Sequence, residues 1–433
     1  MYYYNYSLEL NYAHNIRYLI SDKILNKTAS HFYLDSIGKP SSAVELSLLT
    51  MRFSEINIVK SIKVAFIPNI VFIMISSNKA LLLLRIYFLL LDVSYSWNMT
   101  SLNLSDDVLI WRFAVWKNRA FLAIPRSANE KMEYKPTLVE VSWPEINSNW
   151  PVRFINTAII PFSKNGLSKY NYRERTLVSV TGLDVDARGR LWILDAPDQY
   201  DRWPQIVIYD LKRNDRLISA TELFDVSPKY LRALVIDPVG DQWGSRGYIA
   251  DAGDETIIVY SLGQAKWWKL RMLHEPEIPR VHSTDLAISR RNSILYMTGH
   301  NTHDLFSINL NKVREDEVFR TASHGVQNIT VTWLGKKLGP SMGLICDLKD
   351  GLHYFMTSER ASVRWDTKLP LNAQSHSVLM QSNDVPCITD YVMDTRRNIW
   401  GLVNLKCPGA TKKNVSTSIL KSRIVRILKY SFT

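Results

Sequence analysis

The chain has 433 residues, a formal net charge of +12, 46% apolar residues and 11% aromatic residues. That apolar content suffices for a large core and excludes an intrinsically disordered protein. The positive charge is spread along the sequence without a nucleic-acid-binding motif, so we predict no nucleic-acid partner, whereas an anionic matrix is compatible with it.

Residues 1–73 show neither sustained periodicity nor a repeat, and we assign them no function. Residues 74–96 have the layout of a secretory signal peptide, with a basic residue before the apolar run 80–91 and small residues after it. Such a signal normally begins a chain. Either translation starts at Met74 and the upstream extension is a gene-model artefact, or residues 64–91 form a signal anchor. Polar interruptions of the longer stretch favour cleavage and a secreted, extracellular protein, with a membrane as partner only if the segment stays uncleaved.

From residue 97 onward one pattern recurs six times: an apolar run, a tight polar turn and a second apolar run. Asp, Asn and Gly supply the turn conformations that fold two strands back on each other. A third stretch rich in β-branched and aromatic residues follows most of these hairpins. The predicted hairpins are residues 113–123, 183–193, 234–251, 286–297, 344–355 and 391–400, and the predicted third strands are residues 137–142, 206–210, 256–260, 305–308 and 362–365.

An aromatic residue anchors each hairpin, and successive anchors lie roughly 45 to 70 residues apart, close to the repeat length of propeller blades. The anchors are Phe121, Trp192, Tyr248, Tyr296, Tyr354 and Trp400. Six such units predict an all-β fold, a six-bladed β-propeller over residues 97–433, preceded by the N-terminal extension and the signal-like segment. In a propeller the mouth of the central channel is where a ligand pocket is expected.

Two carboxylates, Asp184 and Asp186, lie on the same face of a predicted strand, where such a pair could bind a cation or perform acid–base chemistry. Asp186 also begins a turn, as Asp237, Asp347 and Asp394 do in other repeats. We therefore predict a turn role for Asp186 and leave the role of Asp184 open.

The sequence offers little else that could carry catalysis. His300 and His303 would lie on opposite faces of a strand, and no further ligand completes a zinc pattern, so we predict exposed turn histidines. His353 and His376 form a pair by composition alone. Trp267 and Trp268 could stack on a ligand, although packing between blades explains them as well. Common hydrolase and nucleotide-binding signatures are absent, so we predict no metal and no cofactor, and the catalytic residues are unknown.

Modification signals follow the signal-like segment. Four N-x-S/T sequons suit a secreted glycoprotein and predict glycosylation of Asn98, Asn103, Asn328 and Asn414. The three cysteines are too few for a disulfide scaffold. Cys387 and Cys407 flank the last hairpin and could form a disulfide bond; the alternative is three buried thiols.

Several of these segments resemble the insect yellow and major royal jelly protein family. The resemblance runs in order over about residues 97–433 and is carried by residues 124–126, 135–138, 177–195, 248–262, 362–367 and 398–404. It implies a secreted six-bladed propeller from an arthropod, with roles in pigmentation, eggshell, larval food or salivary binding of biogenic amines. Some members of the family speed dopachrome conversion. The cysteines that commonly flank the second blade are missing here, which makes this a divergent member.

The resemblance also implies where a ligand would bind. In amine-binding members the last blade supplies an Asn and a nearby aromatic residue at the channel. Asn404 matches the Asn, whereas Lys406 occupies the position of the aromatic residue, and Asp384 could supply a compensating carboxylate. We therefore predict Asn404 and Asp384 as ligand-binding residues. A buried cation at position 406 would repel an ammonium ligand.

We predict a secreted yellow-like propeller with a non-catalytic extracellular role. It would act in cuticle, eggshell or a pigmentation-related matrix, or bind a small aromatic or amine ligand. The enzymatic alternative is an isomerase that converts dopachrome in the melanin pathway. A third alternative is a metal-dependent lactonase-type propeller, which would need residues such as Asp184, Asn301 and Asn404 around a divalent cation.

Overall fold

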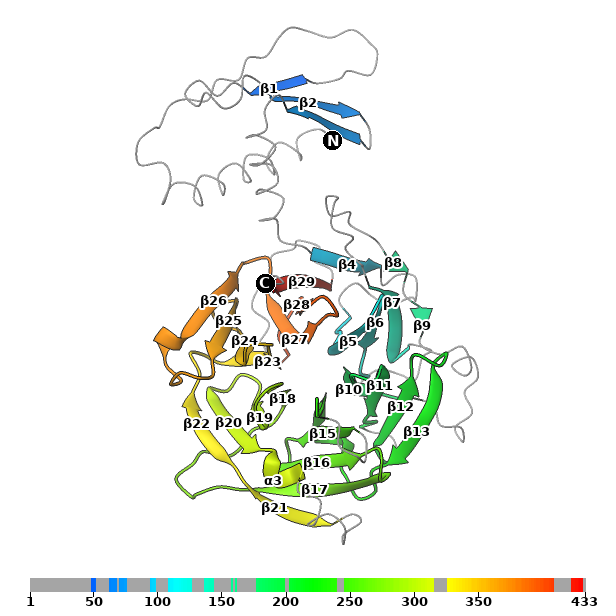
Figure 1. Cartoon of the computed structure of the whole chain (residues 1–433), viewed down its shortest axis with the longest axis vertical. Coiled ribbons are helices and arrows are strands. Elements are labelled where there is room, and N and C mark those ends of the chain that lie inside the picture. The colour runs from blue at the N-terminus through cyan, green and yellow to red at the C-terminus, as the bar shows by residue number, and fades with distance from the viewer. Residues whose placement is uncertain are drawn as a thin grey trace. The chain divides into compact units, whose positions relative to one another are not determined.

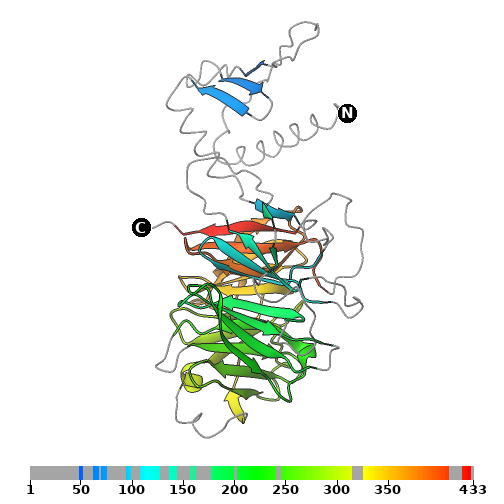
Figure 2. The ribbon, with the colours of Figure 1, turned by 90° about the vertical axis from the view of Figure 1, so that its right-hand side faces the viewer.

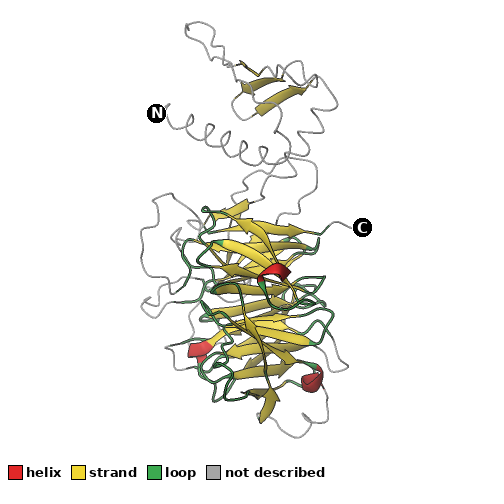
Figure 3. Ribbon diagram, turned by 90° about the vertical axis from the view of Figure 1, so that its left-hand side faces the viewer, coloured by secondary structure: helices red, strands yellow, loops and turns green. Residues whose placement is uncertain are grey.

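The computed structural model describes residues 108–126, 136–143, 177–198, 202–239, 245–314, 325–408 and 422–430, and the backbone of six further strand segments. Within these ranges strands dominate, and the helical elements are α3 (Asn311–Arg314) and the 3-10 turns Pro228–Tyr230 and Ala373–Ser375 (Figure 3). The chain divides into two compact units, residues 1–91 and 92–433. In the first unit, the described residues form an antiparallel three-stranded sheet of β1 (Leu48–Met51), β2 (Ile62–Ile67) and β3 (Ile70–Ile75).

The second unit is a six-bladed β-propeller, as the repeats predicted (Figures 1 and 2). Blade I comprises β5 (Arg112–Trp116), β6 (Arg119–Ala123), β7 (Leu138–Ser142) and β9 (Ile160–Pro161), and blade II comprises β10 (Val180–Val185), β11 (Arg190–Asp195), β12 (Gln205–Asp210) and β13 (Arg216–Glu222). Blade III contains β14 (Leu231–Ile236), β15 (Arg246–Asp251), β16 (Thr256–Ser261) and β17 (Lys266–Leu273). Blade IV contains β18 (Asp285–Ile288), β19 (Ile294–Thr298), β20 (Asp304–Asn309) and β22 (Thr332–Lys336). Blade V contains β23 (Ser341–Cys346), β24 (Gly351–Met356), β25 (Ala361–Asp366) and β26 (His376–Gln381).

Blade VI closes the ring with strands from both ends of the unit. It comprises β27 (Cys387–Met393), β28 (Asn398–Asn404), β29 (Arg423–Lys429) and β4 (Ser94–Asn98), and β29 and β4 lie side by side in Figure 1. β4 pairs with β29 through Ser94, Tyr95 and Ser96, and continues into a parallel pairing with β8 (Thr157–Ala158). The outermost strand of the last blade therefore precedes the first blade in sequence.

Blade III carries an additional strand. The segment between the third and fourth strands of blade IV returns as β21 (Val326–Thr330), which pairs in parallel with β17. Asn328, one of the predicted glycosylation sites, is exposed on this outer strand. Asn98 is the last residue of β4, and Asn103 and Asn414 lie outside the described residues, as does most of the signal-like segment.

A buried aspartate organises four of the hairpin turns, which confirms the turn role predicted for Asp186. One oxygen of Asp186 accepts hydrogen bonds from the backbone N–H groups of Arg188 and Arg190, and the other accepts from the indole of Trp192. The same pattern recurs at Asp394, whose second oxygen accepts from the indole of Trp400 at 2.8 Å. Each aspartate thus fixes its turn and ties it to the anchor residue of the next strand.

In blade V the anchor residue differs from the prediction. Asp347 makes the turn bonds, but its partner on the second strand is His353, at 2.9 Å, and not Tyr354. Tyr354 is buried in the interface between blades IV and V, and its hydroxyl hydrogen-bonds to His376 at 2.8 Å. His353 and His376 therefore serve two different structural contacts.

Six hydrophobic clusters hold the ring together, one between each pair of neighbouring blades. The anchor residues lie within them; Trp192, for example, is fully buried between blades II and III and packs edge-on against Tyr260. Trp267 and Trp268 are buried in the clusters on either side of blade III, which is the packing role considered for them. Because every blade packs on two neighbours, closing the ring completes the core.

Because successive strands of each blade are antiparallel, its loops lie on two opposite faces of the propeller. Turns from the first to the second strand and from the third to the fourth strand lie on one side, which we call the hairpin face. Turns from the second to the third strand, and the connections between blades, lie on the other side, which we call the crossover face. The first strands of all six blades surround the axis between these faces (Figure 1).

Candidate binding site

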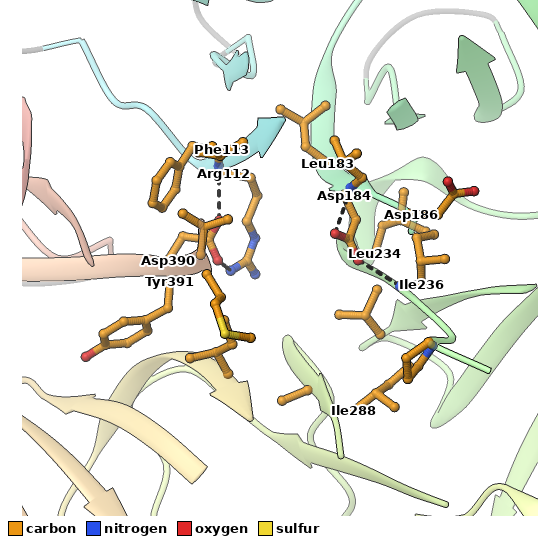
Figure 4. A pocket seen from close by; sticks show the side chains of 18 of the residues that line it. Arg112, Phe113, Leu183, Asp184, Asp186, Leu234, Ile236, Ile288, Asp390 and Tyr391 are labelled. Carbon is orange, nitrogen blue, oxygen red and sulfur yellow. Dashed lines mark hydrogen bonds and ion pairs between the residues drawn. The ribbon is translucent and has the colours of Figure 1, made fainter. Parts of the chain in front are cut away.

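A cavity of about 520 Å³ occupies the axis and is lined by residues from the first strands and the hairpin turns. Aliphatic side chains from several blades line its middle, with Leu183, Leu234, Ile236 and Ile288 labelled in Figure 4. Asp184 lies on one wall, and Arg112 lies with Asp390 (Figure 4). Charged residues of the hairpin turns complete the lining: Lys117, Asp186, Lys212, Asp237, Arg290 and Asp394. A volume of this size is typical of sites for small molecules.

Arg112, at the start of β5, crosses the axis and forms one end of the cavity. Its guanidinium pairs with Asp285 at 2.7 Å and with Asp390 at 3.2 Å, and donates further hydrogen bonds to the carbonyls of Arg232, Thr284 and Thr389. These partners belong to blades III, IV and VI, so a side chain of blade I spans the ring. The indole of Trp111 crosses in the same direction and donates to the carbonyl of Arg232 at 3.1 Å.

The layer of Asp285 and Asp390 carries small residues in three other blades. Asp285 and Asp390 each stand four residues before the first residue of their hairpin turn, Ser289 or Asp394, and the corresponding positions of blades II, III and V are Gly182, Ala233 and Gly343. Gly343 has a φ of +66°, and a Cβ atom there would approach the Tyr391 ring to 3.0 Å. A Cβ atom at Gly182 would approach Cβ of Leu234 to 2.9 Å, so both glycines allow neighbouring blades to pack closely.

The carboxylates of this layer also link neighbouring blades. Asp390 accepts a hydrogen bond from the backbone N–H of Phe113 in the next blade at 3.0 Å, and Asp285 accepts from Gly343 in the same way. Burial opposes the ionisation of Asp285, but His300 and Arg112 outweigh it and hold the pKa of that carboxyl well below its usual range. For Asp390 burial prevails over Arg112 and raises the pKa to about 6.

Asp184 lies on the cavity wall without a cation in contact. Its oxygens accept from the backbone N–H of Val185 at 2.7 Å and of Ile236 at 2.8 Å, so it joins blade II to blade III (Figure 4). A carboxylate has about four acceptor positions, and these bonds use two. Burial raises the pKa of Asp184 to about 6, although both N–H groups oppose that rise. Asp184 is therefore a buried acceptor group on the wall of the cavity.

The pKa of Asp184 predicts a pH dependence of stability that an Asp184→Asn variant would reduce. A folded-state pKa near 6, against about 3.9 in the unfolded chain, means that the folded state binds the extra proton between these values. The free energy of unfolding contributed by this group therefore falls as the pH rises from about 4 to about 7. In the variant we expect the fall in the free energy of unfolding between about pH 4 and pH 7 to be smaller by about 1–2 kcal/mol, measured by urea unfolding. Glu275→Gln, at an exposed position, is the control; an unchanged slope in Asp184→Asn would contradict the assignment.

The two ligand-binding residues predicted from the sequence lie elsewhere. Asn404 is buried at the end of β28, where its amide donates to the carbonyl of Ile110 and to the hydroxyl of Thr389 and its oxygen accepts from the Ile110 N–H. It thus attaches the segment before β5 to the last blade. Asp384 is exposed in the connection between blades V and VI, where its carbonyl accepts from Arg423. Neither residue lines the axial cavity.

Other predicted residues take structural positions. A disulfide bond joins Cys387 to Cys407, and Cys346 is a free, buried cysteine. His300 is not the exposed residue predicted: it approaches Asp285 to 3.2 Å and packs edge-on against Trp111, whereas His303 is exposed.

The residues considered for a divalent cation do not form one set. Asn301 accepts from Thr357 in an exposed loop, Asn404 binds Ile110 and Thr389, and Asp184 binds blade III. Among the described residues, no group of three or more His, Cys, Asp or Glu side chains is placed to hold a metal ion.

Fold and site together define a six-bladed β-propeller with an axial cavity that a transverse arginine closes at one end. The comparison with known families then places it more closely. The profile of the Major royal jelly protein family matches residues 178–428, more than half of the chain. The chain belongs to this family, as the resemblance predicted.

Individual relatives are distant. The Yellow-related salivary protein LJM17 of Lutzomyia longipalpis is 23% identical over 350 residues, covering 72% of this chain and 80% of that protein. Among solved structures, the luciferin-regenerating enzyme is 14% identical with a TM-score of 0.41, covering 78% of this chain and 95% of the other. Virginiamycin B lyase from Staphylococcus aureus is 9% identical with a TM-score of 0.42, covering 76% and 98%. We draw no functional argument from either structure.

Proposed function

We propose that this chain is a secreted member of the family with a non-catalytic extracellular role, and that its axial cavity holds a small aromatic ligand. The observation that carries the ligand proposal is Asp184, a carboxylate with unused acceptor positions beside the aliphatic side chains of Leu183, Leu234 and Ile236 in the cavity. Apolar walls favour a flat apolar body, and the carboxylate favours a ligand N–H or O–H group, because a buried acceptor gains most from a donor.

Secretion is supported by the signal-like character of residues 74–96 and by the sequons, of which Asn328 is exposed. The name of the related protein LJM17 describes it as a salivary protein. Among the described residues there is no helix with the length and apolar content to span a bilayer. Expression of the full chain in insect cells, followed by amino-terminal sequencing of protein from the medium, tests secretion; retention of the chain in the cells would contradict it.

Calorimetric titration tests the ligand proposal. We expect binding of indoles or catechols to the wild-type protein and an affinity about tenfold lower in Asp184→Asn, since a hydrogen bond to a charged acceptor is worth about 1.5–3 kcal/mol. Asp225→Asn removes an exposed carboxylate of the crossover face and should bind as the wild type does. Equal affinities in all three proteins, or no binding of any indole or catechol, would rule out this site.

A second candidate is the dopachrome-converting isomerase, because the pKa of about 6 at Asp184 suits a group that gives and takes protons near neutral pH. Isomerisation moves a proton without a net redox change, so one carboxyl group could in principle serve both transfers. The conversion rate with purified protein, compared with the spontaneous rate, distinguishes the two functions. A rate that rises with wild-type protein and not with Asp184→Asn would favour the enzyme; no rise with wild-type protein would favour the non-catalytic role.

A further inference from the structure

The two faces of the propeller differ in charge. On the hairpin face, the turns between first and second strands carry exposed cations from five of the six blades: Lys117, Arg188, Arg290, Arg291, Lys349 and Arg397. The turns between third and fourth strands add others, among them Lys212. These side chains surround the mouth of the axial cavity, and Lys117, Lys212 and Arg290 reach its lining.

In the part of the hairpin face that the structure describes, carboxylates do not offset these cations at the surface. The turn aspartates are buried and engaged in the hairpin bonds, and Asp237 additionally receives a bidentate contact from Arg314, with the shorter bond at 2.7 Å. Among the described residues of these turns, no Asp or Glu is exposed. The aspartates shape the loops while the cations project into solvent.

The exposed carboxylates gather on the crossover face instead. They include Asp198, Asp225, Asp254, Glu275, Glu359 and Asp384. Among the described residues of the propeller, the exposed charges are therefore distributed unevenly between the two faces. Such a field orients an anionic partner toward the hairpin face before contact.

The composition of the hairpin face indicates which kind of polyanion fits. Proteins that bind single-stranded nucleic acids combine cations with exposed aromatic residues on which bases stack. Here Trp116 is half-buried beneath the ammonium group of Lys117, at 4.7 Å from the ring centre. Among the described residues, the exposed aromatic residues are Trp203, Phe224 and Tyr230 in loops of the crossover face and Trp333 on β22. The described part of the hairpin turns thus presents cations without an exposed aromatic residue, which suits repeated sulfate or carboxylate groups.

We propose that the hairpin face is a docking surface for an anionic polysaccharide, which the cations around the cavity mouth bind through its sulfate or carboxylate groups. The choice of a polysaccharide rests on the proposed extracellular role, whereas the location of the surface rests on the charge distribution alone. The site differs from the axial cavity, because Arg188, Arg291 and Lys349 do not line it.

Heparin, as a sulfated polysaccharide of known chain length, tests the proposal at about 0.15 M salt, where long-range effects are screened beyond about 8 Å. The test variant combines Arg188→Gln, Arg291→Gln and Lys349→Gln. The control combines Arg280→Gln, Arg360→Gln and Lys406→Gln, which remove the same charge from exposed positions of the crossover face. We expect the heparin Kd to rise about tenfold in the test variant and less than about threefold in the control, given about 0.5 kcal/mol or more per exposed contact.

An equal loss of affinity in both variants would overturn the assignment to the hairpin face. A DNA duplex that binds more tightly than heparin at equal charge concentration would overturn the choice of a polysaccharide. The Asp184→Asn variant should bind heparin as the wild type does. Wild-type protein that binds heparin but no indole or catechol would therefore count against the cavity proposal alone. Wild-type protein that binds an indole or a catechol but not heparin would count against the polysaccharide surface alone.

Discussion

Replacing Arg112 with methionine is expected to destabilise the propeller by about 3–5 kcal/mol, the usual cost of removing one partner from a buried ion pair. Methionine fills a similar volume but removes the guanidinium from Asp285 and Asp390, and it removes a donor from the carbonyls of Arg232, Thr284 and Thr389. Asp285 keeps His300, and the Arg232 carbonyl keeps the indole of Trp111. The loss should appear as a lower urea midpoint at pH 7, because the guanidinium no longer offsets the cost of burying the two carboxylates.

A matched comparison separates this effect from the general loss of an arginine. Arg119→Met also removes a cation from two carboxylates, Glu140 and Asp215, but all three side chains are partly exposed, so we expect a loss of about 1 kcal/mol. Adding Asp285→Asn and Asp390→Asn to Arg112→Met should recover part of the lost stability, because neutral amides cost less to bury unpaired. If Arg112→Met unfolds within 1 kcal/mol of the wild type, the transverse ion pair is not a major element of the ring.

Removing β4 is expected to open the ring. A chain that begins at Asp92 keeps the strand and should unfold cooperatively, whereas a chain that begins at Met99 lacks every residue that pairs with β29. Three residue pairs at about 1 kcal/mol for each hydrogen bond give a loss of about 2–4 kcal/mol, and the uncovered edge of β29 promotes association between molecules. Thermal unfolding and size-exclusion chromatography measure both effects; identical behaviour of the two chains would show that β4 does not hold the ring closed.

The position of β4 also constrains processing of the chain. The division at residues 96 and 97, between the signal-like segment and the propeller, cuts through a strand whose pairing residues are Ser94, Tyr95 and Ser96. If the chain is secreted as proposed, we expect its mature amino terminus to lie at or before Ser94, since a later cleavage removes the pairing. Amino-terminal sequencing of the secreted protein reads this directly.

The fold could be predicted because its signals are local. Each hairpin has a polar turn between two apolar runs, and four of the six turns begin with an aspartate, so the repeats and their third strands are visible in the sequence. The fourth strands are not: β13 is largely exposed and has no apolar alternation that would distinguish it from a loop. β4 could not be predicted for another reason: its partner β29 lies near the other end of the chain, so no local pattern marks their pairing.

The candidate site could be predicted only in part. Asp184 draws attention through its spacing from Asp186, although its partner Ile236 cannot be inferred from that spacing. Arg112 gives no signal, since its partners lie 120 to 278 residues away and a single arginine before an apolar run resembles a surface residue. Asn404 matches the family pattern in type and place, yet its amide is committed to holding Ile110 and Thr389.

Ring closure sets an order of events during biosynthesis. At about 5–20 residues per second, β4 is synthesised tens of seconds before β29, so it has no β29 to pair with while the five intervening blades are made. The last blade then holds both ends of the unit in one sheet. An exopeptidase that attacks either end must first separate β4 or β29 from this sheet, so the closed ring protects the ends of the unit.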